Sequence, residues 1–264
     1  MKIGFVGCGN MAGAMLSGIL DAGSYQATDI IGADIYAPSR EATKEKYGIT
    51  VTADNNEVVK QADVVILSIK PQFCEDVIRE IKNEVKEGQL FITIIPGKTL
   101  SWLEDVFGQK VKIIRTMPNM PAIVKEGMTG VCSNAYVTEE DMQKAIDILS
   151  GCGLVEVVSE KLLEVVTGVS GSSPAYVFMF IEAMADAAVA GGMPRDKAYT
   201  FAAQAVMGSA KLLLESGKHP GELKDMVCSP GGTTIGAVRV LEDKGFRSAV
   251  FEAVTESTRI ARQL

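Results

Sequence analysis

The stretch IGFVGCGNMA at residues 3–12 decides the fold of this chain. An apolar run, Ile3 to Val6, leads without a break into a glycine-rich turn, and a helical pattern over Met11 to Ala22 follows. In this order of strand, turn and helix, the motif G-x-G-x-x-A indicates a dinucleotide-binding site. The chain is therefore expected to open with the first β-α unit of a Rossmann fold.

Each small residue of the motif has a physical role of its own. Gly7 permits the tight turn, Gly9 lets the backbone approach a pyrophosphate, and Ala12 lets the helix and the strand pack closely. The first N–H groups of the helix would stabilise the bound anion. A glycine-rich turn without a ligand is the alternative interpretation. The residues predicted to contact the cofactor here are Gly7, Gly9, Asn10, Met11 and Ala12.

Short β-branched runs alternate with helical patterns as far as residue 159, which predicts an α/β fold with a doubly wound, mostly parallel sheet. Most runs are apolar throughout, as parallel strands covered on both faces require. The predicted strands are Ile3–Val6, Asp29–Ala33, Asp63–Ser68, Leu90–Ile94, Lys112–Arg115, Met128–Cys132 and Val155–Val158. The predicted helices between them are Met11–Ala22, Arg40–Tyr47, Phe73–Val85 and Glu139–Ser150. Residues 1–159 are thus assigned to a dinucleotide-binding Rossmann domain.

From residue 160 the strand-like runs end, and the chain is predicted to be all helical. The predicted helices are Lys161–Val169, Ala175–Ala190, Arg195–Leu214, Glu222–Val227, Ile235–Lys244 and Phe246–Arg262. Charged side chains are so few between Pro174 and Leu214 that two of these helices are apolar nearly all round. Residues 160–264 therefore form a predicted substrate-binding and dimerisation domain, in which a second copy buries these helices. A central helix inside a monomeric bundle is the alternative.

Composition narrows the function further. The 264 residues are 47% hydrophobic and carry a formal net charge of −7, so we expect a globular core and no nucleic acid as partner. The five cysteines are never spaced as C-x-x-C, which predicts no disulfides and no metal site, and favours a reducing, cytoplasmic setting. Glu182 and Asp186 interrupt the longest apolar stretch, so neither a membrane-spanning helix nor a membrane partner is predicted.

The second predicted strand is followed by Asp34, whose carboxylate could accept hydrogen bonds from a ribose diol and favour NADH. Ser39 and Arg40 come soon after and could instead hold the 2′-phosphate of NADPH. Arg40 could equally begin a solvated helix. Both cofactors therefore remain open at this point.

Two further turns directly follow predicted strands, Lys70-Pro71 and Pro96-Gly97. Ligands of open α/β sheets bind outside the carboxyl ends of the strands, so these turns are candidates for the ribose and nicotinamide walls. Ordinary turn residues would look the same.

The helical half contains a second glycine-rich segment, CSPGGTT at residues 228–234, directly before a predicted helix. Free N–H groups, the helix dipole and hydroxyls together could bind a carboxylate or a phosphate. A helix connector with a threonine cap is an equally good interpretation of the spacing. The candidate substrate-binding residues are Ser229, Gly231, Gly232, Thr233 and Thr234.

The single histidine, His219, lies in a polar turn and is not an expected catalytic group. Serine or cysteine triads and histidine-based proton transfer are therefore excluded. Reduction of a carbon–nitrogen double bond remains, because an imine needs mainly a nicotinamide held against its carbon and a hydroxyl or water nearby.

The motifs described so far resemble those of the pyrroline-5-carboxylate reductases, which make proline from L-1-pyrroline-5-carboxylate. The matching blocks are GCGNMA at 7–12, SIKP at 68–71, RTMPNMPA at 115–122, GVSGSSPAYVF at 168–178 and DMVCSPGGTTI at 225–235. They span essentially the whole chain. The resemblance implies NADPH- or NADH-dependent reduction of the C=N bond by a Rossmann domain, and a helical domain that forms homodimers, often assembled as pentamers of dimers.

The resemblance also implies roles for single residues. The loop at Ser229 to Thr234 would hold the substrate carboxylate, Thr234 would be the candidate proton donor, and Glu160 matches a glutamate that contacts substrate. The implied cofactor contacts are residues 9–12, Asn55, Ile69, Lys70 and Pro96. Two residues depart from the family pattern: Asp34 stands where members that favour NADPH often carry serine, and Pro96 where relatives commonly carry alanine.

Two other functions fit a dinucleotide-binding chain. A β-hydroxyacid dehydrogenase has a similar two-domain plan but uses a lysine as acid or base, and no lysine lies between Lys161 and Lys197. A regulator that senses the dinucleotide without chemistry would need an effector surface, and the sequence has no basic patch.

Overall fold

The computed structural model describes residues 1–263, which fall into two compact units. The sheet unit consists of residues 1–171 and the C-terminal residues from 256 onward, and the helical unit consists of residues 172–255. The boundary predicted between residues 159 and 160 remains a prediction.

An eight-stranded sheet forms the centre of the sheet unit, with the strand order β3-β2-β1-β4-β5-β6-β7-β8. The strands are β1 Ile3–Val6, β2 Ile30–Ala33, β3 Thr50–Thr52, β4 Val64–Leu67, β5 Leu90–Thr93, β6 Lys112–Met117, β7 Gly127–Ser133 and β8 Gly153–Val157. All neighbours are parallel except β6 and β7. The first six strands follow the order of doubly wound dinucleotide-binding sheets, so the predicted fold class is confirmed.

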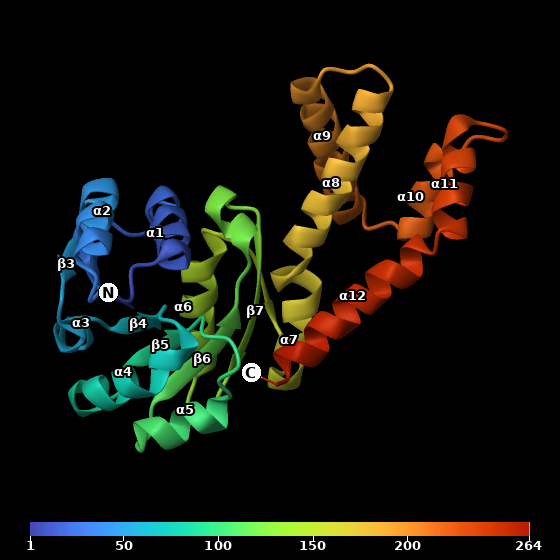
Figure 1. Ribbon diagram of the computed structural model, residues 1–264. Coiled ribbons are helices and arrows are strands. Elements are labelled where there is room, and N and C mark those ends of the chain that lie inside the picture. Colours follow the sequence, from blue (N-terminus) through green and yellow to red (C-terminus); the bar gives the residue numbers. More distant parts are fainter. Residues whose placement is uncertain (264) are drawn as a thin grey trace. The chain divides into compact units, whose positions relative to one another are not determined.

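Helices cover both faces of this sheet (Figure 1). They are α1 Asn10–Asp21, α2 Ala37–Tyr47, α3 Asn55–Gln61, α4 Cys74–Ile81, α5 Leu100–Phe107 and α6 Glu139–Ser150. Apolar residues of α3, α4 and α5 pack on one face, and those of α1 and α6 pack on the other. The carboxyl ends of the parallel strands are thereby left as the open edge of the sheet.

The sequence prediction missed β3, α3 and α5. β3 has three residues, two of them threonines, and the two helices have seven and eight residues, so each is too short to give a full period of apolar side chains. The prediction also extended one helix too far: α4 ends at Ile81 rather than Val85, and a short 3₁₀ turn, Lys82–Glu84, follows it.

A single helix was predicted over Lys161–Val169, and this was wrong. The chain forms a 3₁₀ turn, Glu160–Leu162, then α7, Leu163–Val166, and then a π-helical segment, Thr167–Gly171. The side-chain hydroxyl of Thr167 donates to the carbonyl of Leu163 at 3.0 Å, which stabilises this wider turn.

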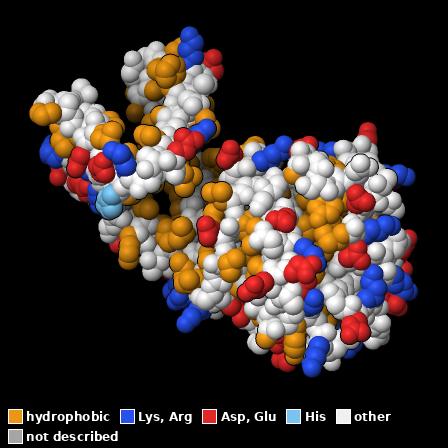
Figure 2. All heavy atoms as spheres, turned by 180° about the vertical axis from the view of Figure 1, so that it is seen from behind, with side chains coloured by type: hydrophobic (Ala, Val, Ile, Leu, Met, Phe, Trp, Pro, Cys, Tyr) orange, Lys and Arg blue, Asp and Glu red, His pale blue; other side chains and the backbone are white. Residues whose placement is uncertain are grey.

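The remaining elements are α8 Ser173–Ala190, α9 Arg195–Ser216, α10 Pro220–Val227, α11 Thr233–Asp243 and α12 Phe246–Ala261, which begins in the helical unit and ends in the sheet unit. Among residues 172–255 only three alanines are buried: Ala185, Ala198 and Ala202. Large apolar side chains are exposed instead, among them Phe178, Met179, Phe201, Leu214 and Phe251. Figure 2 shows hydrophobic side chains on the surface of these helices. Three alanines cannot form a core, so these helices do not bury their apolar faces among themselves.

One stretch of the described residues, Glu160–Ala190, is long and apolar enough to cross a membrane by length and composition alone. Only 6% of its most apolar window is buried within the single chain. A helix at the interface between two subunits has the same apolar surface.

Candidate functional site

The glycine-rich turn between β1 and α1 is held from both neighbouring strands. The N–H of Gly7 donates to the carbonyl of Ala33 at 2.7 Å, and the hydroxyl of Ser68 donates to the carbonyl of Gly7 at 2.6 Å. Gly7 has φ 95°, and a Cβ on it would lie 2.5 Å from the carbonyl oxygen of Ser68. Both the backbone conformation and the lack of space therefore require glycine at this position.

The first turn of α1 is open above Gly9, the residue at its N-cap. A Cβ on Gly9 would meet no atom within 4 Å, and no side chain of the described residues caps the helix there. Asn10 and Met11 begin the helix, while Ala12, 1% exposed, packs into the core beneath. A helix start without a side-chain cap, with open space at Gly9, fits an anion such as a pyrophosphate.

Asp34 follows β2 and is bound to this turn. Its carboxylate accepts the N–H of Cys8 and the N–H of Tyr36, each at 2.9 Å, and the hydroxyl of Ser39 at 3.3 Å. The guanidinium of Arg40 donates to the carbonyls of residues 34 and 35, at 2.7 and 3.0 Å. Asp34 thus orients the glycine-rich turn, and the Nη1 group of Arg40 is occupied by backbone carbonyls.

A cavity of about 660 Å³ lies beside this turn, within the size range of small-molecule sites. It brings together six of the predicted cofactor residues: Gly7, Gly9, Asp34, Asn55, Ile69 and Lys70. Its charged lining consists of the acidic Asp34, Asp76 and Glu80 and the basic Lys70. The amide of Asn55 donates to the carboxylate of Glu80 at 3.2 Å, so two of these polar side chains are already paired.

Four residues that line one side of this cavity were not predicted: Phe73, Asp76, Val77 and Glu80. They recur at spacings of three and four after Lys70-Pro71: Phe73 is the N-cap residue of α4, and the other three share one face of that helix. That periodicity, combined with the position of the turn at a strand end, is the signal that could have identified them.

Pro96 and Gly97 do not line this large cavity, and neither does Pro71, which begins a 3₁₀ turn at residues 71–73. Pro96 and Gly97 line a separate cavity of about 20 Å³ together with Arg115 and Glu164. Such a volume holds little more than one water molecule.

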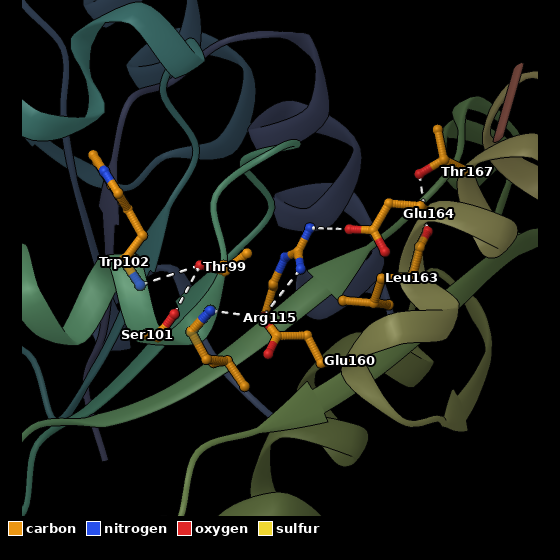
Figure 3. Close-up of polar contacts among 9 residues, drawn as sticks. Thr99, Ser101, Trp102, Arg115, Glu160, Leu163, Glu164 and Thr167 are labelled. Carbon is orange, nitrogen blue, oxygen red and sulfur yellow. Dashed lines mark hydrogen bonds and ion pairs between the residues drawn. The ribbon is translucent and has the colours of Figure 1, made fainter. Parts of the chain in front are cut away.

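Arg115, Glu160 and Glu164 form a polar cluster next to that small cavity (Figure 3). The guanidinium of Arg115 donates to Glu160 at 3.1 Å and to Glu164 at 2.9 Å, and the side chain of Arg115 is only 5% exposed. Glu160 also accepts the backbone N–H of Leu100 at 2.6 Å. The Oε1 atom of the predicted substrate contact Glu160 is therefore engaged within the sheet unit, and the side chain is 34% exposed. Arg115 and Glu164 were missed, although an arginine inside the apolar strand KIIRTM requires acidic partners.

The segment predicted to bind an anion in the helical unit forms a tight turn before α11. The N–H of Gly232 donates to the carbonyl of Ser229 at 3.0 Å, and Gly231 has φ 67°. A Cβ on Gly232 would lie 2.4 Å from the hydroxyl of Ser229. Gly232 is the N-cap, so Thr233 and Thr234 are the first two residues of α11, and among the described residues no side chain caps it. The turn therefore presents backbone N–H groups and hydroxyls together, as binding of a carboxylate requires.

The remaining candidate groups have structural roles. Nδ1 of His219 accepts the N–H of Gly221 at 3.0 Å, which caps α10. Burial, with the nearby Asp34 carboxylate adding to it, raises the pKa of the Cys8 thiol to about 12, so this thiol stays protonated and unreactive. Within residues 1–263, no group of three or more histidine, cysteine or acidic side chains could hold a metal ion.

Two family models match separate parts of the chain. The model described as "NADP oxidoreductase coenzyme F420-dependent" matches residues 2–97, and the model described as "Pyrroline-5-carboxylate reductase dimerisation" matches residues 160–264. The first range contains the glycine-rich turn and the large cavity, and the second contains Glu160 and the turn before α11.

Full-length relatives are similar over the whole chain. The pyrroline-5-carboxylate reductase of Escherichia coli (strain K12) is 52% identical over 266 residues, which cover 100% of this chain and 98% of that protein. Among solved structures, a pyrroline-5-carboxylate reductase from Coxiella burnetii has a TM-score of 0.93 at 34% identity, covering 99% of this chain and 97% of that one. The Plasmodium falciparum pyrroline carboxylate reductase with NADP bound has a TM-score of 0.89 at 30% identity, covering 100% and 97%.

Proposed function

The chain belongs to the pyrroline-5-carboxylate reductase family, and from this premise we propose that it reduces L-1-pyrroline-5-carboxylate to L-proline with the residues assigned below. The enzyme is an oxidoreductase of proline biosynthesis that uses NADPH or NADH. Similarity over the full length favours this activity over a β-hydroxyacid dehydrogenase and over a regulator without chemistry.

The observation that carries the proposal is the open, uncapped start of α1 beside a cavity large enough for a dinucleotide half. The residues that would hold the pyrophosphate are Gly7, Gly9, Asn10, Met11 and Ala12, through backbone N–H groups. Asp34, Asn55, Ile69, Lys70 and Pro71 would surround the adenosine half, and Pro96 and Gly97 the nicotinamide half. When bound, the reduced nicotinamide supplies the hydride.

Ser229, Gly231, Gly232 and Thr233 would hold the substrate carboxylate through N–H groups and hydroxyls at the start of α11. Thr234, the second residue of that helix, would direct its hydroxyl at the ring nitrogen. As hydride adds to the imine carbon, the C=N electron pair moves to the nitrogen; the Thr234 hydroxyl would donate its proton there and regain one from water, which completes the secondary amine. The resemblance also assigned Glu160 to the substrate, but in the structure its carboxylate accepts hydrogen bonds from Arg115 and from the Leu100 N–H.

Thr234 gives the sharpest test. Thr234→Val keeps the shape of the side chain and removes its hydroxyl, while Thr234→Ser keeps the hydroxyl. We expect kcat to fall by about 100-fold in the valine variant and by less than about fivefold in the serine variant, with the KM for the cofactor unchanged. The assay mixes protein, L-1-pyrroline-5-carboxylate and NADPH or NADH, and follows absorbance at the nicotinamide band. Equal kcat in wild type and Thr234→Val would remove this residue from the mechanism.

The chain is a homo-oligomer with a small-molecule substrate. We further propose that the dimer is the basic unit, that it assembles into a pentamer of dimers, and that it works in the cytoplasm. The exposed apolar faces of α8 and α9 support self-association. Sedimentation velocity at micromolar concentration distinguishes a dimer from a decamer, and cell fractionation tests the compartment.

A further inference from the structure

The Arg115 cluster lies at the base of the loop that joins β5 to α5. Arg115 stands on β6 directly opposite Thr93, the last residue of β5. Its two donors reach Glu160 and Glu164, which come from the segment after β8. One buried guanidinium therefore connects the end of β5 with the chain near residue 160 (Figure 3).

Glu160 carries this connection to the start of α5. Leu100 is the first residue of α5, and its N–H has no partner within the helix. The Glu160 carboxylate accepts that N–H at 2.6 Å, and a negative charge is favourable at a helix N-terminus. Arg115 fixes the carboxylate, and the carboxylate fixes the first turn of α5.

The loop held in this way contains Pro96 and Gly97. β5 neighbours β4, and the residues after β4, Ser68 to Lys70, line the large cavity. Because parallel strands end at the same edge, the loop after β5 is the next one along that edge. A dinucleotide whose adenosine half occupies the large cavity would extend its nicotinamide half over this loop. Arg115 and Glu164 line the small cavity with Pro96 and Gly97, and the hydrogen bond from the Leu100 N–H to Glu160 ties the cluster to the end of this loop.

We propose that Glu160 is a positioning residue, which together with Arg115 sets the loop that supports the nicotinamide half, and that it does not bind the substrate. This rests on the proposed reductase activity. Glu160 would affect the alignment of the reactants. If the loop shifted, the nicotinamide ring would be misplaced against the imine carbon, while the contacts of the adenosine half would stay intact.

The chain contains a reporter for this arrangement, because Trp102 is its single tryptophan and lies in the first turn of α5. The N–H of Trp102 donates to the Thr99 hydroxyl at 3.1 Å. In Glu160→Ala we expect the emission maximum of Trp102 to shift in the free protein and kcat to fall about tenfold. The dissociation constant for NADPH, measured by calorimetry, should stay within about twofold of wild type.

Glu164→Ala is the matched control, because it removes the other carboxylate from Arg115 but no bond to α5. We expect it to lower the melting temperature while changing kcat by less than about twofold and leaving Trp102 emission as in wild type. Glu160→Gln keeps an oxygen that can accept the Leu100 N–H, so most of kcat should return. If Glu160→Ala does not fold, Leu100→Pro removes the same hydrogen bond from its donor side, at a helix position that tolerates proline.

Two results would overturn the proposal. A raised KM for L-1-pyrroline-5-carboxylate with unchanged kcat and unchanged Trp102 emission would mean that Glu160 contacts substrate. Equal losses of kcat in Glu160→Ala and Glu164→Ala would mean that the cluster only stabilises the fold. An inactive wild type would contradict the proposed reductase activity instead, while Trp102 emission would still test the link between Glu160 and α5.

Discussion

The sheet unit and the helical unit bury their apolar side chains in different ways. In the sheet unit, β1, β2, β4 and β5 are buried at every residue, and two apolar layers cover the two faces of the sheet. In the helical unit, residues 172–255, three alanines are buried and phenylalanines are exposed. One unit therefore buries its apolar side chains within the chain, and the other leaves them on the surface of the single chain, where the proposed dimer would bury them.

The largest effect is expected from a charge on the exposed apolar surface of the helical unit. Phe178 on α8 is 58% exposed in the single chain. Phe178→Glu would place a carboxylate from each copy in the interface between them, and we expect association to weaken by about 10,000-fold or more. Sedimentation velocity should then show a single chain at micromolar concentration. Tyr136→Glu, at a residue 42% exposed in the sheet unit, is the control and should leave the mass unchanged. If Phe178→Glu keeps the wild-type mass, the contrast between the units is wrong.

The same truncation placed in each unit sharpens the contrast. Phe91 is fully buried on β5, with its ring 5.0 Å from that of Phe107. Phe91→Ala should cost about 3–5 kcal/mol of unfolding free energy, measured by urea denaturation, at every protein concentration. Phe251→Ala, at a helical-unit residue 73% exposed in the single chain, should lower the melting temperature in a way that depends on protein concentration. A concentration-independent loss in Phe251→Ala would place that side chain in an intramolecular core.

The contrast also separates what the sequence could predict from what it could not. The strand, the glycine-rich turn and α1 were predictable, because residues 3–12 contain the whole signal locally. The apolar character of α8 and α9 was equally predictable, because a helix that packs against a partner carries few charged residues, and this shows in its composition. The strand β7 was predicted, but its antiparallel direction was not. The pairing of Arg115 with Cys132 depends on the route of the chain between the two strands, which no local pattern records.

The site residues show the same division. Asp34 and Glu160 were both identified, yet the partners that define their roles were not: Cys8 and Leu100 lie 26 and 60 residues away. No periodic pattern and no fixed spacing in the sequence indicates either of these hydrogen-bonded pairs. Long-range hydrogen bonds of this kind give each carboxylate a structural partner within the chain, and only the folded structure reveals them.

Cofactor choice should depend on the sheet unit, where the large cavity lies. Its lining has three carboxylates and one lysine, so a 2′-phosphate would be repelled there. Asp34→Asn removes one charge and keeps an oxygen for the N–H of Cys8, and we expect the ratio of kcat/KM for NADPH over NADH to rise about tenfold. Asp76→Asn on the same wall should raise that ratio less. A ratio unchanged by Asp34→Asn would mean that the ribose does not lie against Asp34.

The smallest effect tests whether a buried charge of the sheet unit is balanced within the chain. Asp141 lies at the start of α6 and is 6% exposed. Burial opposes the ionisation of its carboxyl group, but hydrogen bonds from Lys112 and Thr138, each at 2.7 Å, outweigh this effect. The pKa of Asp141 is therefore lowered below the usual 3.8. A carboxyl whose pKa is lower in the folded state stabilises the fold above its unfolded-state pKa, and that contribution is lost as the pH falls through the folded-state pKa. At pH 7, Asp141→Asn should therefore melt about 4 °C below wild type, and the gap should close as the pH is lowered below about 4. Because Lys112 and Asp141 belong to the same chain, the gap should not vary with protein concentration, in contrast to Phe251→Ala. A gap that persisted at the lowest pH would mean that packing at this site, rather than the charge, provides the stabilisation.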